Sequence, residues 1–241
     1  MNKLSIIIPA YNEEDRIIYT LEKSLAYLNT REYNSEILVV SDGSTDNTAS
    51  VVKGFDPGQK VRLEFLEYHP NKGKGYAVRY GMLRGTYDII MFMDADYSVE
   101  MSEVEKGINL IEGGADIAIA SRTVAGSIVS QHQNFFRELS AKLYTFTQSL
   151  FLGIDYKDTQ CGFKLFRKET AKNLFSKQLL DSVIFDPEIL WLAKNEGNRV
   201  KEFPVTWTHM EDSRIQYDSL RKSLFVFEEL FRIKKLHKLR R

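Results

Sequence analysis

The first half of the chain alternates between apolar runs and segments with helical spacing, and this alternation is the strongest constraint on its fold. Residues 4–9 form a continuous apolar run, as expected for a strand covered on both faces. Residues 14–28 then place apolar side chains at helical spacing. The alternation continues, with strands expected at 37–40, 61–68, 88–93 and 116–120 and helices at 74–84 and 102–112. It predicts an α/β fold with a mostly parallel central sheet and helices on both faces.

The second half is less regular, but it contains no segment with the composition of a linker. Helices are expected at 134–151, at 185–195 and from 219 onward, with a short strand near 158–166 and another at 199–207. We therefore expect one domain over residues 1–215, followed by a basic amphipathic helix over residues 216–241.

Composition excludes several classes of protein. The 33 Lys and Arg residues balance the 33 Asp and Glu residues, which argues against a general nucleic-acid binder. Cys161 is the only cysteine, so an intrachain disulfide is impossible and a reducing compartment is expected. The apolar runs at 4–10 and 143–154 are too short to span a membrane, and the first is interrupted by Pro9.

Polar clusters follow the expected strands at their carboxyl ends, where open α/β sheets bind ligands. The most informative is Asp94-Ala95-Asp96, which ends the apolar run 89–93. Two carboxylates at the end of a buried strand form an oxygen-rich site suited to Mg²⁺ or Mn²⁺ held between protein and substrate phosphates. The alternative is an ordinary acidic turn.

Two further clusters are typical of nucleotide sites, although each has a structural alternative. Residues 71–75 (NKGKG) precede a helix, where free N–H groups and lysines can bind an anion, but they lack the P-loop spacing. They could equally form a solvated loop. Asp42-Gly43-Ser44 can bind a base or ribose, or form a plain turn.

The remaining candidates have weaker signals. Arg122, Lys164 and Arg214 could be surface cations, and Cys161 has no histidine nearby in the sequence to make it a nucleophile. The four histidines lack the spacing of a zinc site.

Taken together, the segments 5–14 (SIIIPAYNEE), 39–46 (VVSDGSTD), 71–75 and 94–96 resemble the family-two glycosyltransferases with the GT-A fold. Residues 158–166 (DTQCGFKLF) resemble the branch that makes polyprenyl-phosphate sugars, including the dolichyl-phosphate glucosyltransferases, as do Phe185-Asp186 and residues 204–207. The resemblance covers about residues 3–215. Two features differ from the family pattern. Eukaryotic members carry an N-terminal membrane anchor that this sequence lacks, and many relatives have Gly-Ser-Lys in place of Asp212-Ser213-Arg214.

The resemblance implies an inverting, metal-dependent hexosyltransferase that uses a nucleotide-sugar donor. Asp94 and Asp96 would hold Mg²⁺ or Mn²⁺ against the diphosphate. The implied donor-binding residues are Pro9, Tyr11, Glu13, Asp42, Ser44, Lys74, Asp94, Ala95 and Asp96.

The acceptor determines what else the site needs. A phosphate monoester has a second pKa of about 6, so it can attack as a dianion with little help from a base. It does need cations, and we expect Arg122, Lys164 and Arg214 to form that clamp. Asp158 would orient the acceptor, or act as general base if the acceptor were a hydroxyl.

The function expected from these features is transfer of a hexose, glucose from UDP-glucose in the first instance, to a polyprenyl phosphate of the dolichyl type. The alternatives are a GDP-mannose-dependent enzyme, a transferase acting on a saccharide hydroxyl, and an inactive nucleotide-sugar sensor. The expected location is peripheral, on the cytoplasmic face of a membrane, with a homo-oligomer left open. The basic C-terminal segment, with Leu224, Phe227, Leu230 and Phe231 on its apolar face, could bind an anionic bilayer or pack on the domain or a second subunit.

Overall fold

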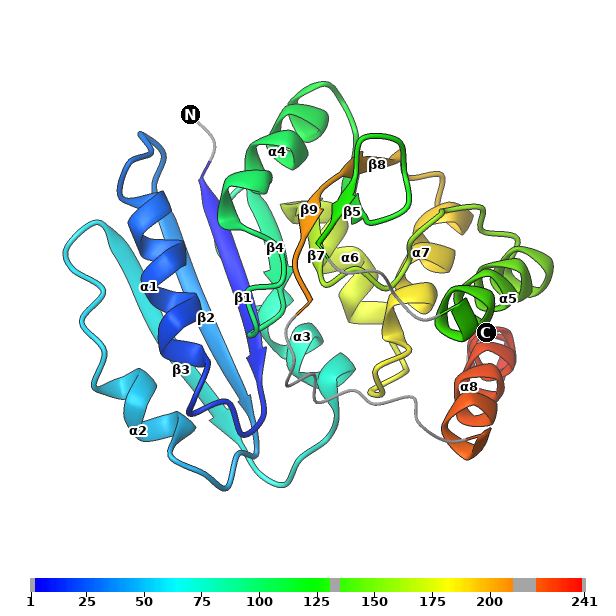
Figure 1. The fold of residues 1–241 in the computed structure, drawn as a ribbon, viewed down its shortest axis with the longest axis horizontal. Helices are drawn as coiled ribbons and strands as arrows, with labels where there is room; N and C mark the ends of the chain where they lie inside the picture. Colours follow the sequence, from blue (N-terminus) through cyan, green and yellow to red (C-terminus); the bar gives the residue numbers. More distant parts are fainter. Residues whose placement is uncertain (1–2, 131–134, 210–219, 240–241) are drawn as a thin grey trace.

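The computed structural model describes residues 3–130, 135–209 and 220–239, with backbone only for 135–143 and 220–226. Its centre is a seven-stranded sheet in the order β3-β2-β1-β4-β7-β5-β8 (Figure 1). Every neighbouring pair is parallel except those of β7, which runs antiparallel to both β4 and β5. The strands are β1 Leu4–Ala10, β2 Ser35–Asp42, β3 Val61–Tyr68, β4 Ile89–Met93, β5 Ile117–Ser121, β7 Phe163–Arg167 and β8 Val200–Pro204. The predicted mostly parallel sheet is confirmed.

Helices cover both faces of this sheet. One face carries α1 (Ile17–Leu28), α2 (Thr48–Lys53), η1 (Met101–Glu103) and α4 (Val104–Glu112). The other carries α3 (Lys74–Met82), α6 (Lys168–Lys177) and α7 (Phe185–Asn195), with α5 (Phe135–Leu152) and α8 (Leu220–Leu239) beyond them. A separate two-stranded parallel sheet joins β6 (Ile128–Val129) to β9 (Thr206–Trp207). The sequence patterns did not predict β6 or α6.

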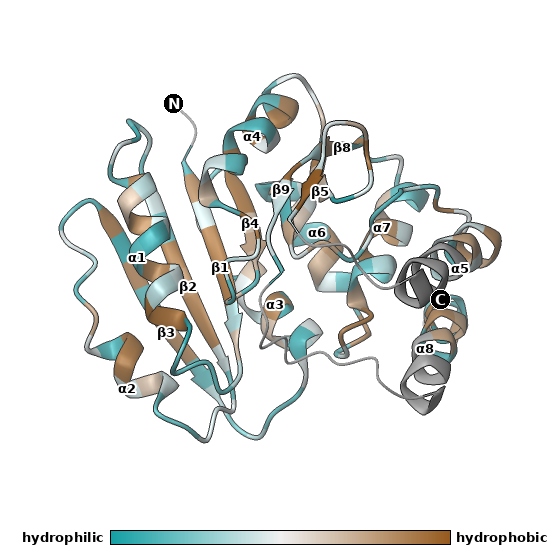
Figure 2. Ribbon diagram, in the orientation of Figure 1, coloured by the Kyte–Doolittle hydropathy of each residue, from teal (hydrophilic) through white to brown (hydrophobic). Residues whose placement is uncertain are grey.

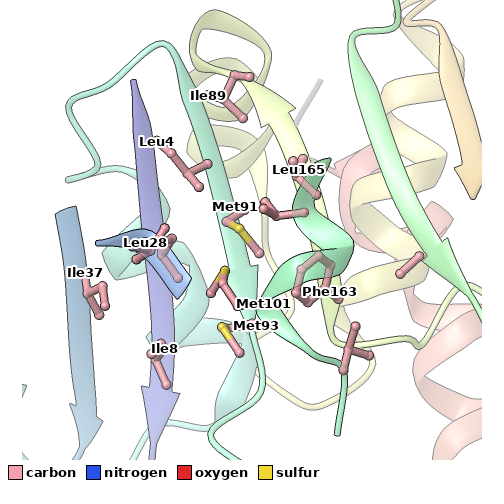
Figure 3. Close-up of a cluster of buried hydrophobic side chains, with 14 of the residues drawn as sticks. Leu4, Ile8, Leu28, Ile37, Ile89, Met91, Met93, Met101, Phe163 and Leu165 are labelled. Carbon is pink, nitrogen blue, oxygen red and sulfur yellow. The ribbon is translucent and has the colours of Figure 1, made fainter. Parts of the chain in front are cut away.

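Side chains alternate between the two faces of each strand, so neighbouring residues of one strand lie in different cores. In β1, Ile6 and Ile8 point into the core beneath α1 and α4, whereas Ile7 points into the core beneath α3. Figure 3 shows the first core, where Met91 and Met93 of β4 contact the same cluster. The central strands are accordingly hydrophobic along their length in Figure 2, because both faces are buried.

The C-terminal helix α8 docks on the domain through apolar and polar contacts. Leu230 and Ile233 are buried in the second core. His237 Nε2 lies 2.6 Å from Glu188 Oε1 of α7, and Glu188 is fully buried. Leu230 therefore packs on the domain, which was one of the two arrangements expected for the C-terminal segment. Within the described ranges, none of the helices has the length and apolar content needed to cross a membrane.

Candidate active site

The two carboxylates predicted to bind a metal lie directly after β4, and their backbone is fixed on both sides. The Asp94 N–H donates to the carbonyl of Gly162 at 3.0 Å. The carbonyl of the buried Ala95 accepts from Thr20 Oγ1 at 2.6 Å. Asp96 Oδ1 accepts from the N–H of Ser98 at 3.0 Å. The chain thus presents Asp94 and Asp96 from a rigid turn at the end of a central strand.

Lys74, at the first position of α3, supplies the positive charge beside these carboxylates. Its Nζ lies 2.5 Å from Asp94 Oδ1. Burial acts to lower the pKa of Lys74, but the carboxylates of Asp94 and Asp186 more than offset this and raise it above its ordinary value. Burial, followed by the charge of Asp94, raises the pKa of Asp96. The lysine is therefore charged. The negative charge of Asp94 makes ionisation of Asp96 less favourable.

Asp42 contacts the loop that precedes α3. Its carboxylate is buried and accepts from the N–H groups of Lys72 at 2.7 Å and Gly73 at 2.9 Å, and from the hydroxyl of Tyr68 at 2.9 Å. Gly73 has a φ of 103°, and a Cβ there would lie 2.4 Å from the carbonyl oxygen of Asp181. Asp42 therefore holds the glycine loop that delivers Lys74.

The loops after β1 and β2 are tied to each other. Ser44 Oγ accepts from the N–H of Asn12 at 3.1 Å, and the N–H of Glu13 donates to Thr48 Oγ1 at 2.8 Å. The buried Glu13 carboxylate accepts from the guanidinium of Arg16 at 2.8 Å. Tyr11 is the member of this group that presents its ring to solvent, and Pro9 lies one residue from the end of β1. Glu13 and Ser44 therefore stabilise the loops that follow β1 and β2.

Arg122 and Asp158 form a bidentate pair. Arg122 Nε donates to Asp158 Oδ2 at 2.7 Å and Nη2 donates to Oδ1 at 2.8 Å, while the Arg122 N–H adds a third bond at 3.0 Å. Nη1 has no hydrogen-bond partner among the described residues. Burial acts to raise the pKa of Asp158, but the guanidinium of Arg122 holds it below its ordinary value. Such a carboxylate is a weak base at neutral pH.

Lys164 does not fit the phosphate clamp expected from the sequence. Only 1% of the side chain is exposed, and its Nζ donates to Asp186 Oδ1 at 2.5 Å and to the carbonyl of Cys161 at 2.8 Å. The Lys164 side chain points beneath α7 rather than toward solvent, because it lies on the same face of the sheet as Phe92. Arg214, the third member of the expected clamp, lies outside the described residues.

Two residues of this site belong to segments singled out from the sequence, but no role was predicted for either. Asp186 begins α7 as the second residue of the helix, and Gly162 lies so close to Asp94 that a Cβ would be 2.1 Å from Asp94 Oδ2. A carboxylate between Phe185 and Pro187 in an apolar stretch was the available signal for Asp186. The close approach of Gly162 depends on the pairing of β4 with β7, which no local pattern encodes.

The site thus combines an Asp-x-Asp turn with a lysine loop at the carboxyl ends of a mostly parallel sheet. The glycosyl transferase family 2 matches residues 5–175. The chain therefore belongs to glycosyl transferase family 2.

Curated relatives narrow the comparison. The dolichyl-phosphate beta-glucosyltransferase of Drosophila melanogaster is 37% identical over 227 residues, which cover 88% of this chain and 69% of the relative. The proteins of the same name from Saccharomyces cerevisiae and Homo sapiens are 36% and 32% identical, with the same coverage of both chains.

Solved structures share the fold. Mannosyl-3-phosphoglycerate synthase from Rubrobacter xylanophilus matches with a TM-score of 0.74 and 18% identity, over 98% of this chain and 75% of that one. Glucosyl-3-phosphoglycerate synthase from Mycobacterium tuberculosis, crystallised with Mn²⁺, UDP and glucosyl-3-phosphoglycerate, matches with a TM-score of 0.69 and 18% identity, over 96% of this chain and 80% of that one. The predicted GT-A fold is confirmed.

Proposed function

We propose that this chain transfers glucose from UDP-glucose to a polyprenyl phosphate of the dolichyl type, with inversion at the anomeric carbon. The names of the curated relatives support the choice of sugar and acceptor. The observation that carries the proposal is the Arg122–Asp158 pair. Because both Asp158 oxygens accept from Arg122, the carboxylate is poorly suited to take a proton from a sugar hydroxyl. A phosphate dianion does not need that help.

The donor would bind along the carboxyl ends of β1, β2 and β4. Tyr11 would flank the base, while Asp42 would act by holding the loop of Lys74 in place. Lys74 would place its charge beside the diphosphate. Nη1 of Arg122 would face the acceptor phosphate, with Asp158 fixing the plane of the guanidinium.

The donor set fits a divalent cation. Asp94 and Asp96 offer carboxylate oxygens, and no group of three or more His, Cys, Asp or Glu side chains suited to a metal occurs within residues 3–130, 135–209 and 220–239. Mg²⁺ is commonly held by one or two carboxylates together with substrate phosphates, so two aspartates suffice. When bound, the cation supplies stabilisation of the charge that grows on the leaving nucleoside diphosphate. The M. tuberculosis synthase was crystallised with Mn²⁺, which favours the same assignment.

The function can be tested by sugar transfer in vitro. Labelled UDP-glucose and GDP-mannose are offered in parallel with Mn²⁺ and a short-chain polyprenyl phosphate in detergent. We expect glucose label in the organic phase, no transfer after treatment with EDTA, and recovery on adding Mn²⁺ back. Transfer to a free saccharide with none to lipid would overturn the proposal and return Asp158 to the role of general base.

We also infer a membrane-facing patch, defined as Phe146, Leu150 and Phe151 of α5 with Phe231 of α8. Phe146 and Leu150 are 64% and 67% exposed, and the rings of Phe151 and Phe231 pack edge to face with centroids 4.3 Å apart. Exposed lysines of α8 add positive charge to the same helix as Phe231: Lys234, Lys235 and Lys238. Apolar side chains accompanied by lysines match the surface of an anionic bilayer.

Vesicle flotation tests this patch. We expect binding to vesicles that contain anionic lipid, weaker binding to neutral vesicles, and loss of binding in the double variant Phe146→Ser/Leu150→Ser. Leu83→Ser, at an exposed leucine just after α3, is the matched control and should bind like the wild type. Equal binding by the double variant and the wild type would contradict the assignment.

A further inference from the structure

We propose that Lys164 and Asp186 form a buried positioning pair that sets the geometry of Asp94 and Lys74. The inference rests on the glycosyltransferase activity of the proposed function, but not on its sugar or its acceptor. It gives Lys164 a role in place of the phosphate contact predicted from the sequence, and it gives a role to Asp186, which the sequence analysis left unassigned.

The first step of the argument is the register of β4 and β7. Phe92 pairs with Lys164 and Met93 with Phe163, so Asp94 comes next to Gly162 on the neighbouring strand. Side chains two apart on a strand share a face, so Lys164 and Gly162 face the same side as Phe92 and Asp94. The structure agrees, because Lys164 Nζ lies 5.1 Å from the centroid of the Phe92 ring.

The second step is the contact between Gly162 and Asp94. The Gly162 carbonyl accepts from the Asp94 N–H at 3.0 Å, and a Cβ on Gly162 would lie 2.1 Å from Asp94 Oδ2. The Asp94 carboxylate therefore rests directly on the backbone of Gly162. A shift of this backbone must move the carboxylate, because no side chain lies between them.

The third step is what fixes that backbone. Lys164 Nζ donates to the carbonyl of Cys161, the residue before Gly162, at 2.8 Å. The same Nζ is anchored to Asp186 at the start of α7. Cys161 is thereby tied to a helix on the second face of the sheet. The tie passes through a single ammonium group, so we expect its loss to weaken the support of the segment beside Asp94.

The fourth step is the charge arrangement. Lys164 pairs with Asp186 and Lys74 pairs with Asp94, and the charge of Asp186 also acts on Lys74. A buried ion pair is weak evidence for stability, because apolar residues of similar volume often stabilise a core equally well. We therefore infer that the main contribution of the Lys164–Asp186 pair is to place Asp94 and Lys74.

The test separates placement from stability with the apolar double variant Lys164→Met/Asp186→Leu. The double change removes both charges together, so its unfolding midpoint should stay near that of the wild type. We expect kcat to fall by about 10²-fold, because a misplacement of about 1 Å has effects of that size. Wild-type kcat in a folded double variant would overturn the proposal.

A milder variant, Asp186→Asn, keeps an oxygen to accept from Lys164 and is measured by binding. The probe is the nucleoside diphosphate of whichever donor the wild type turns over, with and without Mn²⁺, so the identity of the sugar or acceptor does not enter. We expect the gain in affinity due to Mn²⁺ to fall about tenfold while the affinity without Mn²⁺ is unchanged. An unchanged Mn²⁺ effect together with unchanged kcat would refute the positioning role.

Glu36→Gln is the matched control. Glu36 is buried at the start of β2 and accepts from Ser5 Oγ at 2.6 Å and the N–H of Thr86 at 2.7 Å. It lies at the amino ends of the strands, away from the site. We expect this variant to lose stability while its kcat and its Mn²⁺ effect stay at wild-type values. A loss of kcat equal to that of the double variant would show that kcat follows stability alone, and would overturn the proposal.

Discussion

Asp96 depends less on ion pairing than Asp94, which makes it the cleaner residue for testing the carboxylate turn. Asp94 is paired with Lys74, whereas the structure gives Asp96 a backbone partner in Ser98. We expect Asp96→Asn to lower sugar transfer by about 10²–10³-fold while leaving the unfolding midpoint unchanged, because the substitution removes charge and keeps shape. Asp56→Asn, in an exposed loop, is the matched control. Full transfer by the Asp96 variant would remove Asp96 from the metal site.

Gly162 is in direct contact with Asp94, so even a methyl group added at Gly162 should lower activity strongly. In Gly162→Ala the new Cβ would collide with the Asp94 carboxylate, so we expect transfer to fall by at least about tenfold. Gly54→Ala is the control, because its Cβ would meet no side chain and would lie 3.3 Å from the Ser50 carbonyl oxygen and 4.0 Å from that of Val51. Steady-state rates of the two variants, compared at equal folded fraction, decide the matter. Equal rates would show that Asp94 can move aside without loss.

The Arg122–Asp158 pair predicts how stability depends on pH. The pKa of Asp158 is lower in the folded chain than in the unfolded chain, where it is about 4. The pair therefore stabilises the fold above that pH, and its contribution is lost as the pH falls through the folded pKa. We expect the difference in unfolding free energy between the wild type and Asp158→Asn to be largest near pH 7 and to shrink below about pH 4. A difference independent of pH would contradict the pairing.

At the scale of elements, the contacts that join α8 to the domain include a histidine beside a buried carboxylate. Glu188 accepts from the N–H groups of Leu179 and Leu180, both at 2.8 Å, and also contacts His237. We expect His237→Ala to lower the free energy of unfolding by about 2 kcal/mol, the usual effect of removing a hydrogen bond to a charged group. Chemical denaturation measures it. His69→Ala, at an exposed histidine, is the control and should change little.

The success of sequence reasoning varied with the element. The range 61–68 of β3 and the range 185–195 of α7 were predicted as observed, because apolar periodicity defines both. Helix α6 was missed, since only Ala171, Leu174 and Phe175 among its ten residues are buried and the rest read as a polar connection. The short β6 exists only because β9 pairs with it, which no local pattern encodes.

At the scale of the whole molecule, the sequence predicted which chemical groups gather but not how they pair. Asp94, Asp96 and Lys74 follow strands or begin a helix, so parallel topology alone brings them to one edge. Lys164 was placed wrongly, because a lysine in a polar motif suggests a solvent-facing cation. Its partner Asp186 is 22 residues away in sequence and meets it only across the sheet face. Long-range pairing of this kind needs the tertiary structure.

The burial of Cys161 makes the only thiol of the chain a natural reporter of local opening. The side chain is 1% exposed, and burial raises the pKa of its thiol to about 12, so at neutral pH it is uncharged as well as inaccessible. An alkylating reagent should therefore react only when the segment beside Asp94 opens. We expect labelling, followed by mass spectrometry, to be far slower than in denaturant and slower still with donor nucleotide and Mn²⁺ present. Labelling as fast in the native protein as in denaturant would mean that this segment is open at rest. The alkylation rate of Cys161 would therefore measure how often the segment beside Asp94 opens.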